Sequence, residues 1–260
     1  MPVRKLLAVA ALLVAGALLP LGAAPGQLPT QQDDYTVVAS YPHDPEAFTQ
    51  GLEFKGTRLF ETTGLEGRST LRRVALESGT VKRKVALSDE HFGEGMTIFG
   101  RRLFWITWQT HKAFVYEPRT FRRKTNFTYP GEGWGLTHNR RALVMSDGTS
   151  ELVFRDPKDF SVRRRITVRD SGETIDRLNE LEWVEGEVFA NVWQTNRIAR
   201  IDPSNGNVTG WINISALQEA EEASGDPDVP NGIAYIKAEK RLFVTGKFWR
   251  RVYEIELRNP

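Results

Sequence analysis

Short apolar runs alternate with polar turns along most of the chain, a pattern that is typical of β-strands joined by hairpins. Five segments repeat one arrangement of an apolar strand, a tight polar turn and a second apolar strand. They start at residues 48, 92, 132, 177 and 229 and read FTQGLEFKGTRLFETTG, FGEGMTIFGRRLFWITW, EGWGLTHNRRALVMSDG, RLNELEWVEGEVFANVW and VPNGIAYIKAEKRLFVTGK. A third strand follows in each unit, and a fourth strand follows in most units.

Four short antiparallel strands in roughly 40 to 50 residues are typical of one propeller blade. The matched positions are Gly51, Gly95, Gly135, Glu180 and Gly232, which are 44, 40, 45 and 52 residues apart. We therefore predict an all-β, five-bladed β-propeller. The last unit has only three strands, so we expect the N-terminal strand 35–42 to pair with that blade and close the ring. Closure removes an exposed sheet edge. Helix is expected only at 215–225.

The first 24 residues differ from the repeat. Arg4 and Lys5 precede the apolar run LLAVAALLVAGALL, and PLGAAPG follows it, which is the layout of a secretory signal peptide. The run is shorter than the roughly 20 residues that span a membrane. We expect a signal peptide at 1–24, a flexible linker at 25–34 and one domain at 35–260. An uncleaved membrane anchor is the alternative. The protein is predicted to be exported to the periplasm or the extracellular space, with no membrane contact after signal removal.

Composition narrows the possible chemistry. The chain has no cysteine, which excludes disulfides and thiolate catalysis, and its formal net charge is +2. Arginine pairs are spread along the chain rather than clustered, which indicates solvated outer faces, so we expect no nucleic-acid partner. We also expect a monomer. The four histidines, at 43, 91, 111 and 138, lack the spacing of a metal site, and no metal is expected.

The repeat predicts which side chains meet at the centre, because the first strand of each propeller blade lines the central channel. The residues just before the matched positions are Gln50, Glu94, Trp134, Asn179 and Asn231. The ends of the second strands supply Gly64, Trp108, Gly148, Trp193 and Lys247. The start of one antiparallel strand lies beside the end of its partner. Both rings are therefore expected at one mouth of the channel.

Glu94 is unusual, because a carboxylate lies between two glycines at the start of an apolar strand. We expect it to project into a cavity with amides, indoles and one ammonium group, a combination that is typical of a binding site. A tryptophan at a strand end can instead pack between blades, and a buried acid can bind channel amides. We interpret Trp105, Trp183, Trp211 and Trp249 as packing residues, and Glu132, Glu180 and Glu182 as structural acids.

Seven motifs along residues 35–257 together resemble the plant- and bacterial-type glutamine cyclotransferases, also called glutaminyl-peptide cyclotransferases. The motifs are FTQGL, GEG, EGWGLT, LNELEW, NVWQT, NGIA and TGK followed by W after one residue. The resemblance implies a five-bladed propeller that converts the N-terminal glutamine of peptides to pyroglutamate and releases ammonia without a cofactor. It implies that Glu94 is the catalytic acid and base and that Lys247 is a second polar group of the reaction. The implied substrate-binding residues are Gln50, Phe92, Trp108, Trp134, Asn179 and Trp193.

The reaction itself needs little machinery. The α-amine attacks the carboxamide carbon of its own side chain, so one carboxyl group can accept the amine proton and then donate it to the departing nitrogen. Lys247, Gln50 or Asn179 would supply the hydrogen bond to the developing oxyanion, and the sequence leaves open which of them does so. Aromatic surroundings should raise the pKa of Glu94, and Lys247 should oppose that shift.

Two other functions fit parts of the pattern. Glu94, Asn179 and Asn231 resemble the oxygen ligands of calcium in a lactonase-like propeller hydrolase. A repeat of five rather than six units and the nearby lysine argue against that interpretation. A non-enzymatic peptide-binding propeller is the second alternative. We also expect the acidic segment 217–230 to overhang the mouth as a partial lid.

Overall fold

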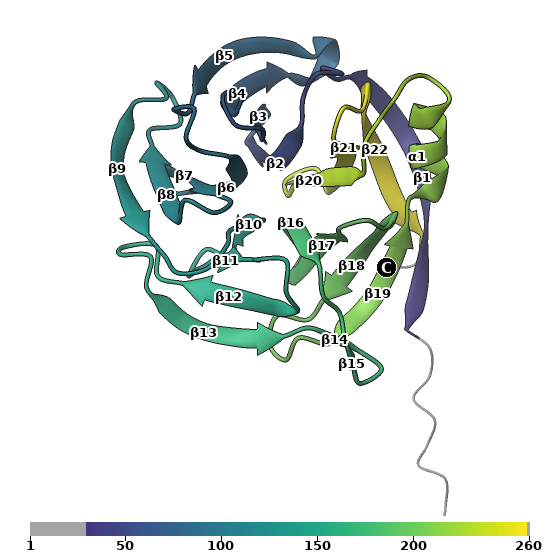
Figure 1. The fold of residues 1–260 in the computed structure, drawn as a ribbon. Helices are drawn as coiled ribbons and strands as arrows, with labels where there is room; N and C mark the ends of the chain where they lie inside the picture. The colour runs from purple at the N-terminus through teal and green to yellow at the C-terminus, as the bar shows by residue number, and fades with distance from the viewer. Residues whose placement is uncertain (1–29, 259–260) are drawn as a thin grey trace, which may run out of the picture.

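The computed structural model describes residues 30–258, so the predicted signal peptide lies outside the described residues. β-Strands dominate, and they are grouped in sheets that form a nearly closed ring (Figure 1). The α-helix of the described part is α1 (Ser215–Glu222), close to the predicted position. Within residues 30–258, no helix has the length and apolar character needed to cross a membrane.

Three sheets consist of four consecutive antiparallel strands each, and one half of an eight-stranded sheet, which we call the fourth sheet, has the same arrangement. Each of these sets begins with the strand nearest the centre of the ring (Figure 1). The first contains β2 (Thr49–Lys55), β3 (Arg58–Thr63), β4 (Thr70–Ala75) and β5 (Thr80–Ala86). The second contains β6 (Gly93–Phe99), β7 (Arg102–Thr107), β8 (Lys112–Tyr116) and β9 (Arg123–Thr128). The third contains β10 (Leu136–His138), β11 (Leu143–Met145), β12 (Glu151–Arg155) and β13 (Val162–Thr167). The fourth contains β16 (Leu178–Val184), β17 (Glu187–Val192), β18 (Arg197–Ile201) and β19 (Val208–Asn213).

The N-terminal strand of the described part pairs with strands from late in the chain. The last three strands are β20 (Pro230–Ile236), β21 (Arg241–Gly246) and β22 (Arg251–Arg258), and β1 (Gln31–Pro42) pairs antiparallel with β22. The start of β1 also runs parallel to β19, through residues 31–33. β1 therefore lies between β19 of the fourth sheet and β22, and β21 and β20 follow β22 in the same sheet.

The strand β1 begins four residues earlier than the predicted strand 35–42, so the expected linker 25–34 is wrong for residues 31–34. The sequence there is QQDD, which has no apolar alternation to indicate a strand. Pairing with β19 and a buried ion pair hold it in place. The carboxylate of Asp33 lies 2.8 Å from a guanidinium nitrogen of Arg200. The small polar hairpin of β14 (Arg169–Asp170) and β15 (Glu173–Thr174) was likewise not predicted.

Apolar side chains fill each interface between neighbouring sheets. Successive residues of a strand point to opposite faces, so one strand serves two interfaces. In β7, Leu103 and Trp105 pack toward the first sheet, whereas Phe104 and Ile106 pack toward the third. Five such clusters follow one another around the ring. The predicted packing roles of Trp105, Trp211 and Trp249 agree with their burial in these clusters.

The innermost strands share an irregularity at their starts. In four of them the pairing register shifts, between Thr49 and Gly51, Gly93 and Met96, Leu178 and Leu181, and Pro230 and Ile233. A β-bulge redirects the side chain that it contains. The residues inside these shifts include Gln50, Glu94, Asn179 and Asn231. The bulges thus turn polar side chains toward the centre of the ring.

The glycines at the matched positions allow the innermost strands to come close together. A Cβ atom on Gly95 would lie 2.6 Å from the backbone nitrogen of Leu136, and one on Gly51 would lie 2.8 Å from that of Met96. The fourth matched position holds Glu180, whose carboxylate instead accepts hydrogen bonds from the backbone of Leu52 at 3.2 Å and Ile233 at 2.8 Å. The bare backbone beside Glu94 is therefore a packing requirement between neighbouring sheets.

Candidate active site

A pocket of about 350 Å³ lies where the bulged starts of the innermost strands meet the ends of the second strands. All eight predicted site residues line this pocket. The complete lining is Phe48, Gln50, Phe92, Glu94, Trp108, Trp134, Asn179, Trp193, Gln194, Asp228, Val229 and Lys247. Seven of the ten predicted ring positions therefore line one pocket, and the exceptions are Gly64, Gly148 and Asn231.

Glu94 is the buried carboxyl group of the pocket, with 5% of the residue exposed. Its Oε1 accepts a hydrogen bond from Nε2 of Gln50 at 2.9 Å. No donor among residues 30–258 is bonded to Oε2. Burial raises the pKa of Glu94 well above its ordinary value, the Lys247 ammonium opposes the rise, and the Glu132 carboxylate adds to it. The predicted direction of the shift is confirmed, and Oε2 remains available to a bound molecule.

Gln50 is held in one orientation by Asn231. The Nδ2 atom of Asn231 donates to Oε1 of Gln50 and to the backbone oxygen of Thr49, both at 2.9 Å. Because Oε1 of Gln50 is the acceptor in that contact, its Nε2 faces Glu94. Asn231 is fully buried and does not line the pocket. Its position in the predicted ring is thus that of a support for Gln50.

Lys247 brings a cation to the same pocket, directly after β21. Its Nζ lies 4.5 Å from the centre of the Phe48 ring, a cation–π contact. Its backbone is fixed to residues 228 and 229 by hydrogen bonds of 2.9 and 3.1 Å. Burial lowers the pKa of Lys247, and the carboxylates of Glu94 and Asp228 oppose this. In the described part of the chain, no oxygen accepts a hydrogen bond from Nζ, so its protons can be donated to a ligand.

Aromatic rings form the walls of the pocket in two edge-to-face pairs. The ring centres are 5.7 Å apart for Phe92 and Trp108, and 5.5 Å apart for Trp134 and Trp193. Two glycines of the predicted second ring make room for them. A Cβ atom on Gly64 would lie 2.4 Å from the Phe92 ring, and one on Gly148 would lie 2.6 Å from the Trp134 ring.

Glu132 connects the two pairs of rings. Its Oε2 accepts hydrogen bonds from Nε1 of Trp108 at 2.7 Å and from Nε1 of Trp134 at 2.9 Å. Its Oε1 accepts one from Nε2 of Gln109 at 2.9 Å. The sequence predicted a structural acid at this position, and the structure shows which groups it binds. Glu132 orients two walls of the pocket and places a negative charge near Glu94.

We expect Glu132→Gln to lower kcat/KM by about tenfold and to move the acidic limb of its pH profile to lower pH. An amide cannot accept both indole protons on one oxygen as strongly as a carboxylate does, because charge-assisted hydrogen bonds are the stronger ones. Loss of the charge also removes one cause of the raised pKa of Glu94, so Glu94 ionises at a lower pH. Steady-state kinetics across pH will measure both effects. The exposed Glu256→Gln variant is the control, and an unmoved limb in Glu132→Gln would contradict the coupling.

The sequence did not identify Phe48, Gln194, Asp228 and Val229 as lining residues. Phe48 and Gln194 lie inside quoted motifs, next to residues that were chosen. Of the expected lid, 217–230, only Asp228 and Val229 reach the pocket. The helix α1 is anchored elsewhere, since Glu221 accepts a hydrogen bond from the Tyr253 hydroxyl at 2.7 Å. The expectation of a lid therefore applies only to the end of this segment.

The donor atoms of the pocket suit an organic molecule. Glu94 and Asn179 offer oxygens, but the cationic Lys247 lines the same space and would repel a metal ion. Within residues 30–258, no group of three or more His, Cys, Asp or Glu side chains is arranged to hold a metal. The Oδ1 atom of Asn179 is buried without a hydrogen-bond partner.

Comparison with known proteins gives a consistent result. A family model described as glutamine cyclotransferase matches residues 9–257. A glutaminyl-peptide cyclotransferase of Arabidopsis thaliana is 44% identical over 230 residues, which are 87% of this chain and 72% of that protein. The crystal structure of Myxococcus xanthus glutaminyl cyclase superimposes with a TM-score of 0.83 at 35% identity, covering 88% of this chain and 98% of that one.

Proposed function

The chain belongs to the glutamine cyclotransferase family, and we propose that it cyclises N-terminal glutamine of peptides with Glu94 as the only acid and base and without a metal ion. The product is pyroglutamate, and ammonia leaves. The observation that carries the proposal is the state of Glu94, which is buried, held through Oε1 by Gln50 and open at Oε2. A buried carboxyl group with a raised pKa and a specific charged partner in a pocket is typical of a functional site.

The proposed fold is a five-bladed propeller closed by β1. Three sheets of four strands support it, together with an eight-stranded sheet that divides into two further sets of four, β16–β19 and β1 with β22, β21 and β20. Five apolar clusters at successive sheet interfaces support it as well. In this fold, one mouth of the channel admits the end of a peptide and leaves the rest of the peptide outside.

The pocket, of about 350 Å³, has room for an N-terminal glutamine. Its aromatic walls suit the methylene groups of that side chain. Glu94 Oε2 can accept a hydrogen bond from a nitrogen of the substrate. Holding the side chain bent brings the α-amine close to the carboxamide carbon, which favours an intramolecular attack.

Proton transfer follows from the position of Glu94. As the α-nitrogen bonds to the carboxamide carbon, it loses a proton to the carboxylate of Glu94. The protonated Glu94 then donates that proton to the departing nitrogen when the carbon–nitrogen bond breaks, and ammonia is released. The raised pKa of Glu94 brings it nearer to that of an α-amine, about 7.7 to 8.0, which makes the first transfer less unfavourable.

Lys247 is the proposed donor to the oxyanion. Gln50 donates from Nε2 to Glu94, so one of its two amide protons is engaged. Lys247 is buried, with 5% of the residue exposed, and its ammonium protons make no hydrogen bond to residues 30–258, so they can stabilise developing negative charge in the pocket. Asn179 then remains for recognition of the substrate amide. The proposal therefore selects Lys247 from the three candidate oxyanion donors, Lys247, Gln50 and Asn179, that the sequence left open.

Two further expectations remain proposals. We propose export to the periplasm or the extracellular space after removal of residues 1–24, and a monomer that binds no nucleic acid. The polar exposure of both β5 and β9 agrees with a free outer surface, since most of their residues are exposed.

The test is ammonia release from a glutamine-initiated dipeptide by the purified protein, with and without a chelator. We expect equal rates in both, and no release from the matching dipeptide that begins with acetylated glutamine, whose nitrogen cannot attack. Activity that disappears with chelator and returns with calcium would support the hydrolase alternative. Saturable peptide binding without ammonia release would support the non-enzymatic one.

A further inference from the structure

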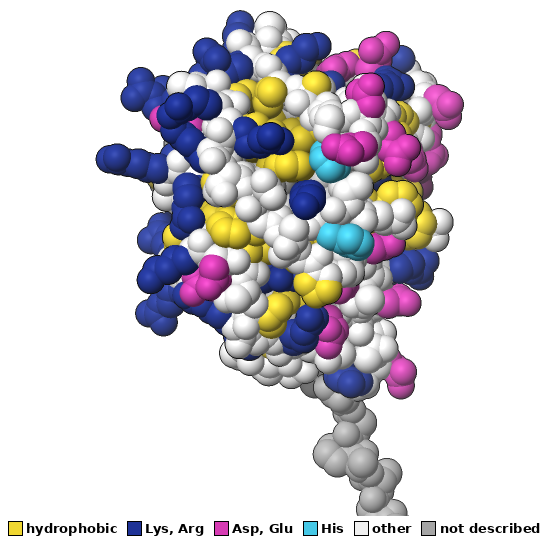
Figure 2. Space-filling model, turned by 60° about the vertical axis from the view of Figure 1, so that its left-hand side comes forward, with side chains coloured by type: hydrophobic (Ala, Val, Ile, Leu, Met, Phe, Trp, Pro, Cys, Tyr) yellow, Lys and Arg dark blue, Asp and Glu magenta, His cyan; other side chains and the backbone are white. Residues whose placement is uncertain are grey.

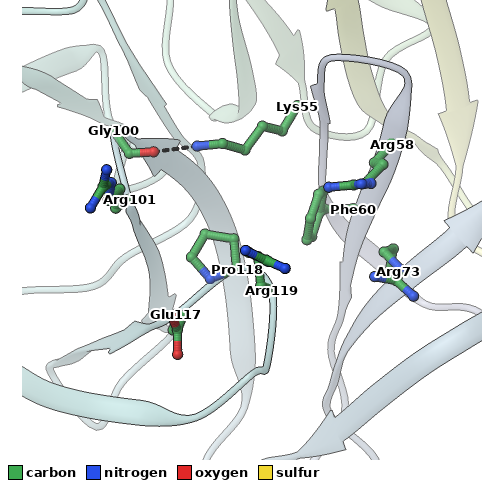
Figure 3. A pocket seen from close by; sticks show the side chains of 9 residues that line it. All are labelled: Lys55, Arg58, Phe60, Arg73, Gly100, Arg101, Glu117, Pro118 and Arg119. Carbon is green, nitrogen blue, oxygen red and sulfur yellow. Dashed lines mark hydrogen bonds between the residues drawn. The ribbon is translucent and has the colours of Figure 1, made fainter.

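A second hollow, which we call the arginine groove, lies between the first and second sheets. It has a volume of about 440 Å³. Its lining is Lys55, Arg58, Phe60, Arg73, Gly100, Arg101, Glu117, Pro118 and Arg119 (Figure 3). Lys55 ends β2 and Gln50 lies near its start, so at about 3.3 Å per residue the groove is roughly 17 Å from the active site. The two sites open at opposite ends of the innermost strand.

The groove is strongly cationic. Five of its side chains are cations and one is a carboxylate, so the lining has a net charge of +4. The carboxylate of Glu117 is already engaged, since it accepts a hydrogen bond from the Thr120 hydroxyl at 2.8 Å and lies 3.7 Å from Nζ of Lys124. In Figure 2, Lys and Arg side chains crowd one side of the molecule, whereas Asp and Glu gather mainly on the other.

The guanidinium groups of the groove lack internal partners. Within residues 30–258, Arg58, Arg73 and Arg101 make no ion pair and no side-chain hydrogen bond. Arg73 is also directly opposite Arg83 in the pairing of β4 with β5. Like charges in that relation destabilise a sheet. A bound anion would remove the repulsion and satisfy the unpaired donors.

The groove also has the features of a formed site. Lys55 reaches across it, and its Nζ donates a hydrogen bond to the backbone oxygen of Gly100 in the second sheet (Figure 3). Arg83 makes a similar crossing to the backbone oxygen of Thr120, at 3.3 Å. Phe60 is buried and provides an apolar floor. The cations are thus arranged around a hollow of small-ligand size.

We propose that the arginine groove binds a small ligand, or a lipid headgroup, that carries two or more clustered phosphate groups. Guanidinium groups match phosphate oxygens with paired hydrogen bonds. A phosphate group carries about −1.5 to −2 charges, so two of them balance the groove within its volume. Carboxylates would need about twice as many groups in the same space.

The test is isothermal titration calorimetry of the full protein with inorganic tripolyphosphate at physiological ionic strength. We expect saturable binding and a raised Tm, because a ligand that binds only the folded state stabilises it. The variant Arg73→Ala/Arg101→Ala should weaken binding on the order of 100-fold, since each charge-assisted contact contributes roughly tenfold. The control Arg140→Ala/Arg250→Ala removes the same charge from exposed positions outside the groove. Retained ammonia release will show that the variants are folded.

Two further experiments show whether the bound phosphates belong to a free ligand or to a lipid headgroup, and whether the groove prefers phosphate to other anions. Flotation with phosphatidylcholine vesicles that contain a phosphoinositide, compared with vesicles that contain phosphatidylserine, distinguishes a phosphorylated headgroup from general anionic attraction. Groove-dependent binding to tripolyphosphate alone supports a free ligand, and groove-dependent flotation supports a headgroup. Absence of both kinds of binding, equal losses in the control variant, or displacement by polyglutamate as effective as by tripolyphosphate would each overturn the proposal.

Discussion

Glu94→Gln is expected to lower kcat for ammonia release by about 10²- to 10⁴-fold, the usual contribution of a positioned acid or base. Glutamine has nearly the shape of glutamate, and its Oε1 can still accept the hydrogen bond from Gln50. What disappears is the ability to accept a proton from the α-amine and return it to the leaving nitrogen. KM should change little, because the walls of the pocket remain. Steady-state kinetics with a glutamine-initiated dipeptide will measure the effect.

The fold should survive this substitution. Burial raises the pKa of Glu94, so the folded state holds its proton more tightly than the unfolded state does. The ionised group therefore opposes folding as pH rises through its folded-state pKa, and a neutral glutamine removes that cost. We expect an unchanged or higher Tm at neutral pH. Glu90→Gln, on the exposed side chain four residues earlier, is the control. A variant at 94 that keeps a tenth of the normal rate would exclude Glu94 from proton transfer.

Lys247→Met is expected to lower kcat by roughly 10²- to 10³-fold, as loss of one oxyanion donor does. Methionine retains an apolar stem against Phe48 and removes the charge. Loss of the ammonium group also removes the opposition to the raised pKa of Glu94. The acidic limb of the pH profile should then move to higher pH, which is the reverse of the shift expected for Glu132→Gln.

These opposite shifts separate the two roles of Lys247. A fall in kcat with a limb at higher pH agrees with a cation that acts on both the oxyanion and Glu94. A rise in KM alone, with an unmoved limb, would make Lys247 a substrate contact and leave the oxyanion to another donor. The exposed Lys237→Met is the control, since it removes the same charge from another position.

The repeat in the sequence was sufficient to bring together seven of the twelve residues that line the pocket. Equivalent positions in homologous units meet at an axis, so Gln50, Glu94 and Asn179 were found by alignment of the chain with itself. The bulges that turn these side chains inward leave no apolar signature, and only pairing registers reveal them. The role of Glu132 was also beyond the sequence, because it depends on two indole nitrogens that converge on one oxygen.

The sequence-based prediction was wrong where polar residues form regular secondary structure. Residues 31–34 are all polar and were taken for a linker, yet backbone pairing with β19 and the ion pair of Asp33 make them part of a strand. The expected lid is limited to the end of segment 217–230 for a related reason. An acidic segment looks solvated in the sequence, but Glu221 is buried against the Tyr253 hydroxyl.

The pairing of β1 with β22 also sets an order of events during synthesis. Asp34 pairs with Arg258, so β1 has no antiparallel partner until β22 has been synthesised. Contacts between such distant residues slow folding. A nascent chain arrested before β22 would retain an unsatisfied strand edge, and such edges recruit other chains. Pairing of β1 with β22 is therefore the step that removes this exposed edge.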